Sequence, residues 1–344
     1  MRIVSILLNA LLGTSACRVE SVLWPTTGWK TSTAADQGVD QAELQELDNE
    51  FARGDYGYVD GFLLIRHGYV AHEKSYEHNY KGLFSSAPNK APGPYNYYDF
   101  SWHPFYQGGT LHTMKSITKS VTSALIGVAI QRGEIPGVET NALSYFDGYK
   151  ILDDPRRHSW TLRHLLTMTT GIQWEEDALP YTDPANICAL MEASKDWVQF
   201  VLDQPMAADP GSTFLYNSGA TQLLSHILKK ATGIHADAYA AEYLFKPLGI
   251  SNFYWKRTPT GHADTEGGLY LEPRDLAKIG YLYLHGGVWE GKRILPEGWV
   301  ETSTTVQTST GSDARGLDYG YQSLVSTQVQ NYVKFFECKT STRS

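Results

Sequence analysis

One segment limits the fold more than any other part of the chain: "SITKSVTSALIGVAIQRG", from Ser116 to Gly133. Its apolar and small residues recur at helical spacing and extend around most of the helix, which predicts a helix that is buried on most sides and ends at Gly133. Ser116 and Lys119 are three residues apart at its start, so their Cβ atoms share one face at a separation of roughly 5–6 Å. The sequence therefore places a hydroxyl beside an amine where little water reaches.

Length and composition favour a globular protein with a large core. The chain has 344 residues, of which 42% are hydrophobic, a length typical of two domains or of one large domain with an insertion. The formal net charge is -8 and no basic run is present, which argues against nucleic acid as a partner. The three cysteines, Cys17, Cys188 and Cys338, lack the spacing of a zinc site or a disulfide framework. We therefore expect no metal and no cofactor.

Residues 1–17 have the pattern of a signal peptide. Arg2 precedes an apolar run from Ile3 to Leu12, and small residues lead up to Cys17. The run is shorter than the ~20 apolar residues that a membrane-spanning helix needs. We predict export to the periplasm or the extracellular space. Cys17 also resembles a lipoprotein acceptor, and its lipidation is the one membrane contact that the sequence suggests.

The region after this leader contains a helix and then a hairpin. Residues 40–54 have apolar residues on one side, Asp40 as an N-cap and a glycine at the end, which predicts a surface helix that packs on one face. Two strand-like runs then meet at His67 and Gly68, a pair that fits a tight hairpin turn. An antiparallel sheet is therefore expected to begin here.

The order of the remaining elements indicates an α/β (α+β) fold. Residues 116–250 are mainly helical, and extended segments stand on both sides of them in the sequence. We expect one domain from 18 to 344: an antiparallel sheet flanked by helices, from about 40–115 and 251–344, with an all-helical lobe of about 116–250 inserted into it. The aromatic-rich stretch 92–107 is interpreted as a long loop, with the alternative that it lines a cleft between sheet and lobe.

The residue types at the start of the buried helix suggest nucleophilic catalysis. Serine needs a neighbouring base, and Lys119 serves as one only where burial or a nearby cation lowers its pKa; the apolar helix is expected to provide that burial. A serine and a lysine at this spacing are a weak motif by themselves, and the alternative is a lysine that reaches solvent. Tyr216, Asn217 and Ser218 lie just before a second apolar helix, where the tyrosine is able to shuttle a proton or simply to pack.

The combination of segments resembles the serine β-lactamase and penicillin-binding superfamily, specifically the class C β-lactamase-related hydrolases that include DD-peptidases, esterases and nylon-oligomer hydrolases. The segments are "SITK" at 116–119, "LRHLLTMTTGI" at 162–172, "PGSTFLYNSG" at 210–219, and "GGLYLEPRDLAKIGYLYLHGGVWEGKRILPEGWV" at 267–300. The resemblance implies that Ser116 is the acylated nucleophile, Lys119 its proton acceptor and Tyr216 the tyrosine of the second motif. Asn217 and Ser218 are the expected substrate-binding neighbours, with serine in place of the asparagine of the dedicated β-lactamases.

Two further stretches have simpler interpretations. The third motif of the family, Lys-Thr-Gly or His-x-Gly, has a partial echo at Lys339, Thr340 and Ser341, which we interpret as a coincidence near the chain end. The expectation is a truncated or altered C-terminus that impairs activity. The acidic cluster at 175–177 is interpreted as a solvated loop.

These observations predict a serine hydrolase that cleaves a small ester or amide through an acyl-enzyme. Two alternatives remain: a penicillin-binding or sensing protein with little turnover, and an inactive homologue. The sequence does not identify the acyl group or the oligomeric state, and it contains no motif of the serine α/β-hydrolases, the zinc proteases or the P-loop enzymes.

Overall fold

The computed structural model describes residues 22–57, 59–79, 110–181, 183–311 and 317–326. The leader 1–17 with Cys17, the aromatic stretch 92–107 and the segment 339–341 lie outside these residues, so the expectations about export, lipidation, loop structure and the third motif stay predictions.

The hairpin predicted at His67 and Gly68 is confirmed. Strands β2 (Gly61–Arg66) and β3 (Tyr69–Ser75) pair antiparallel, and β1 (Lys30–Thr31) adds to β3 in parallel. The two turn residues have φ values of 51° and 81°, which is the left-handed conformation that a two-residue type I′ turn requires at both positions.

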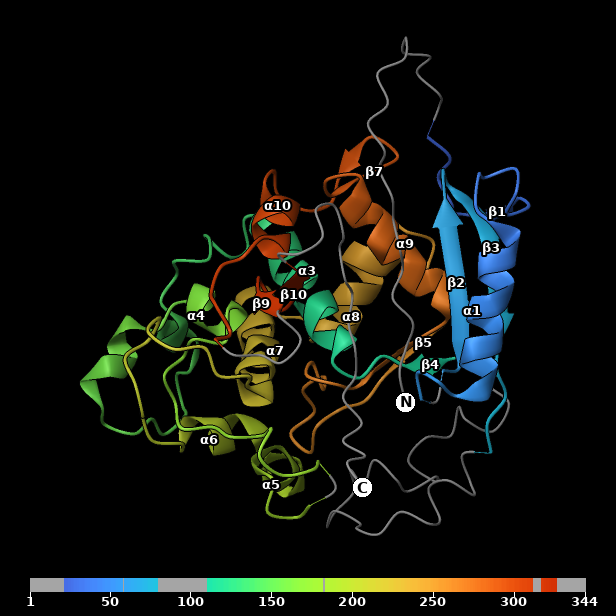
Figure 1. The fold of residues 1–344 in the computed structure, drawn as a ribbon. Coiled ribbons are helices and arrows are strands. Elements are labelled where there is room, and N and C mark those ends of the chain that lie inside the picture. Colours follow the sequence, from blue (N-terminus) through green and yellow to red (C-terminus); the bar gives the residue numbers. More distant parts are fainter. Residues whose placement is uncertain (1–21, 58, 80–109, 182, 312–316, 327–344) are drawn as a thin grey trace.

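Helix α1 (Gln41–Arg53) covers one face of this sheet (Figure 1). It begins and ends as predicted, because the Asp40 side chain accepts hydrogen bonds from two backbone N–H groups of the first turn and Gly54 adopts φ 81° at the end. Phe51 packs against the rings of Phe62 on β2 and of Tyr76, directly after β3. The sheet contacts α9 (Pro273–Leu284) through β2.

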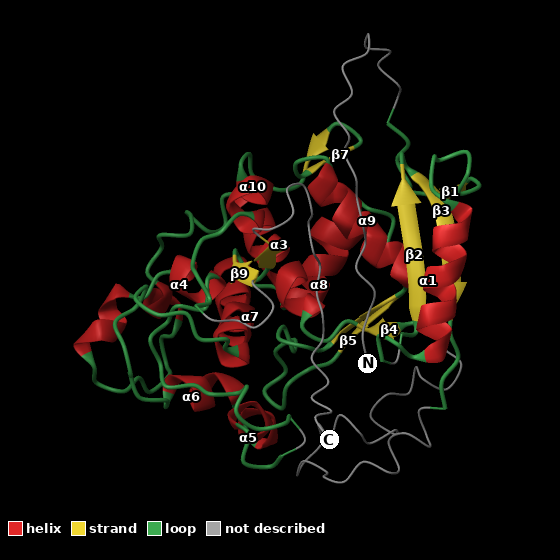
Figure 2. Cartoon of the chain, viewed as in Figure 1, coloured by secondary structure: helices red, strands yellow, loops and turns green. Residues whose placement is uncertain are grey.

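Helix α3 (Ile117–Gln131) is the predicted buried helix, and its first thirteen residues are all buried. It contacts α7 (Ser218–Thr232) and α8 (Ala236–Ala240). Gly127 is needed on α3 because a Cβ atom there would lie 2.8 Å from the indole of Trp299 in α10 (Trp299–Thr304). The helix therefore lies at the centre of the described structure, surrounded by other helices (Figure 2).

The other elements surround α3 and α7. The helices are α4 (Leu162–Leu166), α5 (Ile187–Ala193), α6 (Trp197–Leu202), the 3-10 helices η3 (Ala142–Tyr145) and η4 (Pro155–Ser159), and the π-helix η5 (Ala241–Phe245). The strands are β4 (His112–Thr113), β5 (Phe253–Trp255), β6 (Leu269–Leu271), β7 (Val288–Trp289), β8 (Lys292–Arg293), β9 (Leu317–Tyr319) and β10 (Leu324–Ser326).

A second small sheet positions the start of α3. Strand β6 pairs antiparallel with β4 on one side and with β5 on the other. The backbone N–H of Met114, between β4 and α3, donates to the carbonyl oxygen of Leu269 at 2.8 Å. The first residues of α3 therefore lie next to the segment that precedes β6.

Residues 317–326 connect this region to three helices. The Gln322 side chain donates to the carbonyl oxygen of Leu165 in α4 and accepts from the Thr221 hydroxyl in α7, each at 2.8 Å. The Gln322 carbonyl oxygen accepts from the Ser120 hydroxyl in α3 at 2.6 Å. Strands β9 and β10 lie within the sheet part expected at about 251–344, and the turn between them holds α3, α4 and α7 together.

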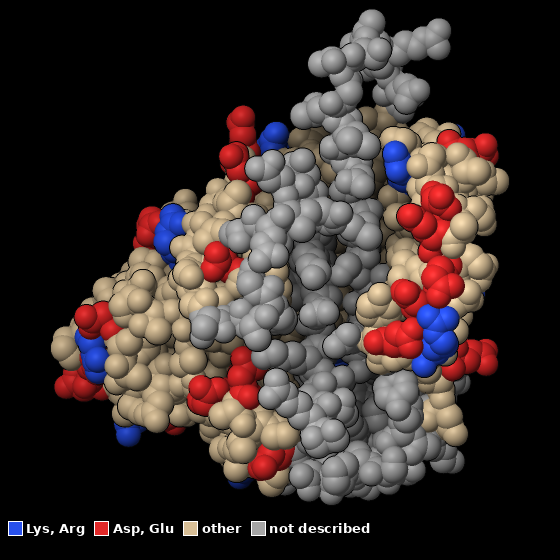
Figure 3. Space-filling view, viewed as in Figure 1, with Lys and Arg blue, Asp and Glu red and all other residues tan. Residues whose placement is uncertain are grey.

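Within the described residues, no helix combines the length and the apolar character needed to cross a bilayer. Acidic and basic side chains lie next to one another on the described part of the face in Figure 3, most visibly over α1.

Candidate active site

Ser116 stands at a sharp bend where β4 leads into α3. Lys115, directly before it, has φ 46°, an uncommon conformation for a residue with a side chain, and Ser116 itself is helical. Serine at a helix start commonly caps the helix with its hydroxyl, but the Ser116 hydroxyl makes no such bond. It lies instead 3.3 Å from Nζ of Lys119, and the residue is half-buried. The bend therefore turns the hydroxyl toward the amine and leaves part of the residue exposed.

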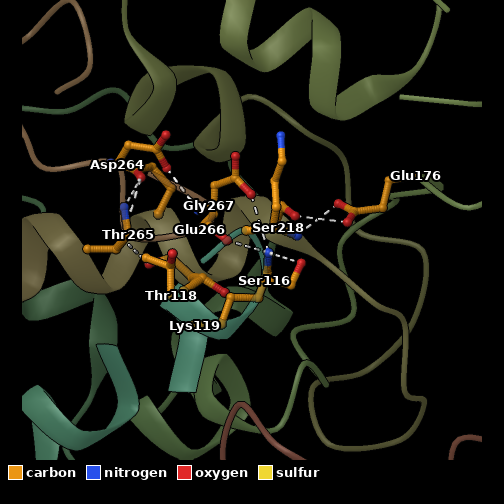
Figure 4. A network of polar contacts seen from close by, with 12 residues as sticks. Ser116, Thr118, Lys119, Glu176, Ser218, Asp264, Thr265, Glu266 and Gly267 are labelled. Atoms are coloured by element: carbon orange, nitrogen blue, oxygen red, sulfur yellow. Dashed lines mark hydrogen bonds and ion pairs between the residues drawn. The ribbon is translucent and has the colours of Figure 1, made fainter. Parts of the chain in front are cut away.

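Lys119 is buried, with 1% of its surface exposed. Its amine donates to Oγ of Ser116 at 3.3 Å, to the carbonyl oxygen of Glu266 at 2.7 Å and to Oε2 of Glu266 at 3.3 Å. These bonds use all three donors of an ammonium group. Figure 4 shows Lys119 between Ser116 and Glu266, with Ser218 and Glu176 beyond.

Tyr216 completes this group from the loop before α7. The Ser116 side chain interacts with its hydroxyl and acts to lower its pKa, and the centre of its ring lies 5.3 Å from Nζ of Lys119. The ring packs edge-on against Tyr319 of β9. Burial raises the pKa of Tyr216 to about 12, although Lys119 acts in the opposite direction. A hydroxyl, an amine and a phenol thus meet at one half-buried point.

The expected lowering of the Lys119 pKa is wrong. Burial alone acts to lower its pKa, but electrostatic interactions with Tyr216, Glu266 and Glu176 together act more strongly in the opposite direction. The pKa of Lys119 is therefore raised above that of an ordinary lysine. The apolar surface of α3 did not predict the direction of the pKa shift, because the carboxylates that raise the pKa come from distant segments of the sequence.

The acidic cluster at 175–177 is solvated only at its ends. Glu176 is 1% exposed, which corrects the prediction of a solvated loop. Its carboxylate accepts hydrogen bonds from the backbone N–H and the hydroxyl of Ser218, from the indole of Trp174 and from the hydroxyl of Tyr181, at 2.6–2.8 Å. Four donors compensate the loss of water, and this makes burial of the carboxylate tolerable.

A family model described as Beta-lactamase matches residues 63–329, which is more than half of the chain. The chain belongs to the Beta-lactamase family. The predicted resemblance is thereby confirmed, and so is the mixed α and β fold class, with small sheets flanked by helices.

Relatives in this family include hydrolases and acyltransferases. The chain is 28% identical over 209 residues to the 6-aminohexanoate-dimer hydrolase of Paenarthrobacter ureafaciens, a match that covers 56% of this chain and 50% of the relative. It is 27% identical over 165 residues to the monacolin J acid methylbutanoyltransferase of Aspergillus terreus (strain NIH 2624 / FGSC A1156), covering 44% of this chain and 40% of the relative. The chain thus spans half the length, or less, of these two proteins.

The fold is similar to that of a solved structure, EstCE1, described as a hydrolase with promiscuous acyltransferase activity. The TM-score is 0.60 at 14% sequence identity, and the match covers 83% of each chain. At this identity the likeness concerns the fold alone.

Asn217 and Ser218, the predicted substrate-binding residues of this Beta-lactamase family member, are both buried. Oδ1 of Asn217 caps α7 by accepting from the backbone N–H of Ala220 at 2.9 Å, and the Ser218 hydroxyl donates to Glu176. Both side-chain oxygens therefore hold the tyrosine loop and the start of α7 in place, and their contact with a substrate stays a prediction.

Sequence reasoning missed Glu176 and Glu266 as members of the site. Glu176 follows Trp174 at a spacing that allows the indole to bond to it, and Glu266 directly precedes the Gly267–Gly268 pair of the last family segment. For Glu266, the available signal was its position directly before a family segment. Glu266 also belongs to the one group of potential metal ligands in the described residues, with Cys188 and Glu192, whose ligand atoms lie within 4.8 Å of one another. The Lys119 ammonium already provides the positive charge at this carboxylate.

We expect Glu176→Ala to lower the free energy of unfolding by about 3 kcal/mol or more, because it leaves several buried donors without their acceptor. Chemical denaturation of the purified variant measures the change. Glu175→Ala is the matched control, since Glu175 is exposed and bonds only to its own turn; we expect a loss of about 1 kcal/mol at most. Equal losses in the two variants would contradict a special role for the buried carboxylate.

Proposed function

We propose that this chain is a serine hydrolase that cleaves a small ester or amide through an acyl-enzyme on Ser116. In the acylation step Oγ of Ser116 forms a bond to the acyl carbon, and its proton passes to the Lys119–Tyr216 pair. The tetrahedral intermediate then breaks its bond to the leaving group, which takes up that proton. Water deacylates the serine by the same route in reverse, with the proton again held by the pair.

The observation that carries this proposal is the placement of the Ser116 hydroxyl. It is turned away from capping its own helix, lies 3.3 Å from Nζ of Lys119, and interacts with the phenol of Tyr216. The N-terminus of α3 adds a positive dipole end and the backbone N–H of Ser116, which stabilise negative charge on an acyl oxygen. Substrate reaches this point because Ser116 and Tyr216 are only half-buried, whereas Lys119 is enclosed.

Lys119 and Tyr216 are best regarded as one titrating pair, because their charges interact strongly. The fully protonated pair, an ammonium and a neutral phenol, has no site that accepts the Ser116 proton. Loss of one proton from the pair creates that site on either group. Since the pKa of Lys119 is raised and that of Tyr216 is raised to about 12, the competent form increases as the pH rises.

We therefore expect the rate of ester hydrolysis to increase steadily with pH across the alkaline range, by about tenfold per pH unit while the pH is below the pKa of the pair. The measurement is a pH–rate profile with an activated ester, corrected for spontaneous hydrolysis with the Ser116→Ala variant. A rate that is constant from about pH 6 to about pH 10 would contradict the assignment of the pair as the proton acceptor.

The substrate class is supported by the relatives and by the second motif. The two relatives are named for hydrolysis of a 6-aminohexanoate dimer and for transfer of a methylbutanoyl group, and we propose an acyl centre of this kind for the present chain. Ser218, in place of the asparagine of the dedicated β-lactamases, favours the ester and amide branch.

The deciding experiment treats the purified chain with an activated ester and with a serine-directed phosphonate, with Ser116→Ala in parallel. Rapid turnover together with phosphonate labelling of Ser116 supports the hydrolase. Labelling with slow release of the acyl group would favour an acylated binding or sensing protein instead. A folded chain without labelling would indicate an inactive homologue.

A further inference from the structure

Glu266 lies on a segment that is held rigidly between α3 and α7. The carbonyl oxygen of Ala263 accepts from the Gln222 and Ser225 side chains of α7 at 3.1 and 2.8 Å. Thr265 is bonded to both helices: its hydroxyl donates to the Thr221 carbonyl oxygen at 3.0 Å, and its carbonyl oxygen accepts from the Thr122 hydroxyl at 3.0 Å. The segment is therefore fixed from two sides immediately before Glu266.

The backbone of the turn after Glu266 is also fixed in its conformation. Gly268 is required because a Cβ atom there would lie 2.6 Å from the Asp264 side chain, and the Gly267 N–H donates to Oδ1 of Asp264 at 3.0 Å. The backbone N–H of Leu269 also donates a hydrogen bond to the Thr118 hydroxyl at 3.2 Å, which restrains the segment further. The backbone thus holds the Glu266 carbonyl oxygen in place against Lys119, and the Glu266 carboxylate reaches the same amine from this fixed residue, as Figure 4 shows.

We infer that Glu266 is a positioning residue of the site: its carbonyl oxygen and carboxylate hold Lys119 as an ammonium ion against Ser116 and thereby make the reaction depend on alkaline pH. The effect of Glu266 on the reaction rate rests on the proposed function. The positive charge of Lys119 follows from its contacts with Glu266, whether or not the chain is a hydrolase.

The charges around Lys119 support the same conclusion. Acidic or titratable groups act on it from the elements packed around it, namely Tyr216 before α7, Glu176 after α4, Cys188 on α5, and Asp264 and Glu266 before β6; Glu192 on α5 in turn interacts with Glu266. Glu266 is the one in direct contact with the amine through its carboxylate. Burial acts to raise the pKa of Glu266, but Lys119 and a hydrogen bond with Glu192 outweigh it, so the pKa is lowered and Glu266 is an anion at neutral pH.

The test is Glu266→Gln, which keeps the size of the side chain and removes its charge. Loss of the carboxylate lowers the pKa of both Lys119 and Tyr216, because Glu266 acts to raise each of them. We expect the alkaline rise in the pH–rate profile to move by about one to three pH units toward lower pH. Glu242→Gln is the matched control, since Glu242 also pairs with a lysine, Lys246, but on the surface with more than half of each side chain exposed. Its profile should equal that of the unmodified chain.

A readout that does not need activity separates this inference from the proposed function. In protein with ¹³C-labelled lysine Cε, the Lys119 signal is assigned by its loss in Lys119→Met. We expect it to keep the ammonium shift up to about pH 11 in the unmodified chain and to titrate at lower pH in Glu266→Gln.

A Lys119 signal in the unmodified chain that titrates at or below the ordinary value of about 10.4 would overturn the inference, and so would identical behaviour of the unmodified chain and Glu266→Gln. If the chain showed neither hydrolysis nor phosphonate labelling but its Lys119 signal titrated as expected, only the proposed function would be overturned.

Discussion

Ser116→Ala is expected to abolish phosphonate labelling and to remove nearly all of the ester hydrolysis. The hydroxyl of Ser116 is the one that lies beside Lys119 and Tyr216 at the bend into α3, and alanine removes the atom that forms the acyl bond. Loss of a nucleophile leaves only binding and oxyanion stabilisation, and such a site retains little of the original rate. Intact-mass spectrometry after phosphonate treatment, followed by peptide mapping, measures the result.

Ser120→Ala is the matched control for this variant. Ser120 lies one turn further along α3 and its hydroxyl donates to the Gln322 carbonyl oxygen rather than to the lysine. We expect full labelling of Ser116 in this variant and a loss of about 1 kcal/mol in the free energy of unfolding. Labelling of the Ser116→Ala protein at another serine would refute the assignment of the nucleophile.

Tyr216→Phe is expected to lower the rate of hydrolysis by about 10²–10⁴-fold while KM changes much less, because the phenol contributes to proton transfer rather than to binding. The variant keeps the ring that packs against Tyr319, so the free energy of unfolding should change little. Steady-state kinetics on an activated ester and on an amide measure the effect. The amide is expected to lose more, since its leaving group depends on protonation by the pair.

Tyr243→Phe is a suitable control for the tyrosine. Its ring lies under the guanidinium of Arg132, 3.7 Å from the ring centre, and this contact persists without the hydroxyl. Its activity should match that of the unmodified chain. If Tyr216→Phe behaved in the same way, the tyrosine would be a packing residue and the Ser116 proton would pass through Lys119 alone.

The local elements of this protein could be predicted from the sequence because short-range patterns determine them. The Asp40 cap and the Gly54 end of α1, the His67–Gly68 turn between β2 and β3, and the apolar surface of α3 each depend on residues within a few positions of one another. The three-residue spacing of Ser116 and Lys119 is also local, since one helical turn brings the hydroxyl and the amine together. For the same reason the family segments indicated the fold class.

Only the tertiary structure decided the charge state of the site. The pKa of Lys119 depends on which groups are packed against it, and Glu266 is 147 residues away in the sequence. Burial on an apolar helix and contact with a buried carboxylate act on that pKa in opposite directions, so the sign of the shift follows from a contact that spacing does not reveal. Glu176 was misplaced for the same reason: an acidic residue in a polar stretch is ordinarily solvated, and its burial requires Ser218, 42 residues away, to supply donors. A sequence motif identifies the reacting side chains because their spacing is local. Their protonation states depend on long-range contacts that form only when the chain folds.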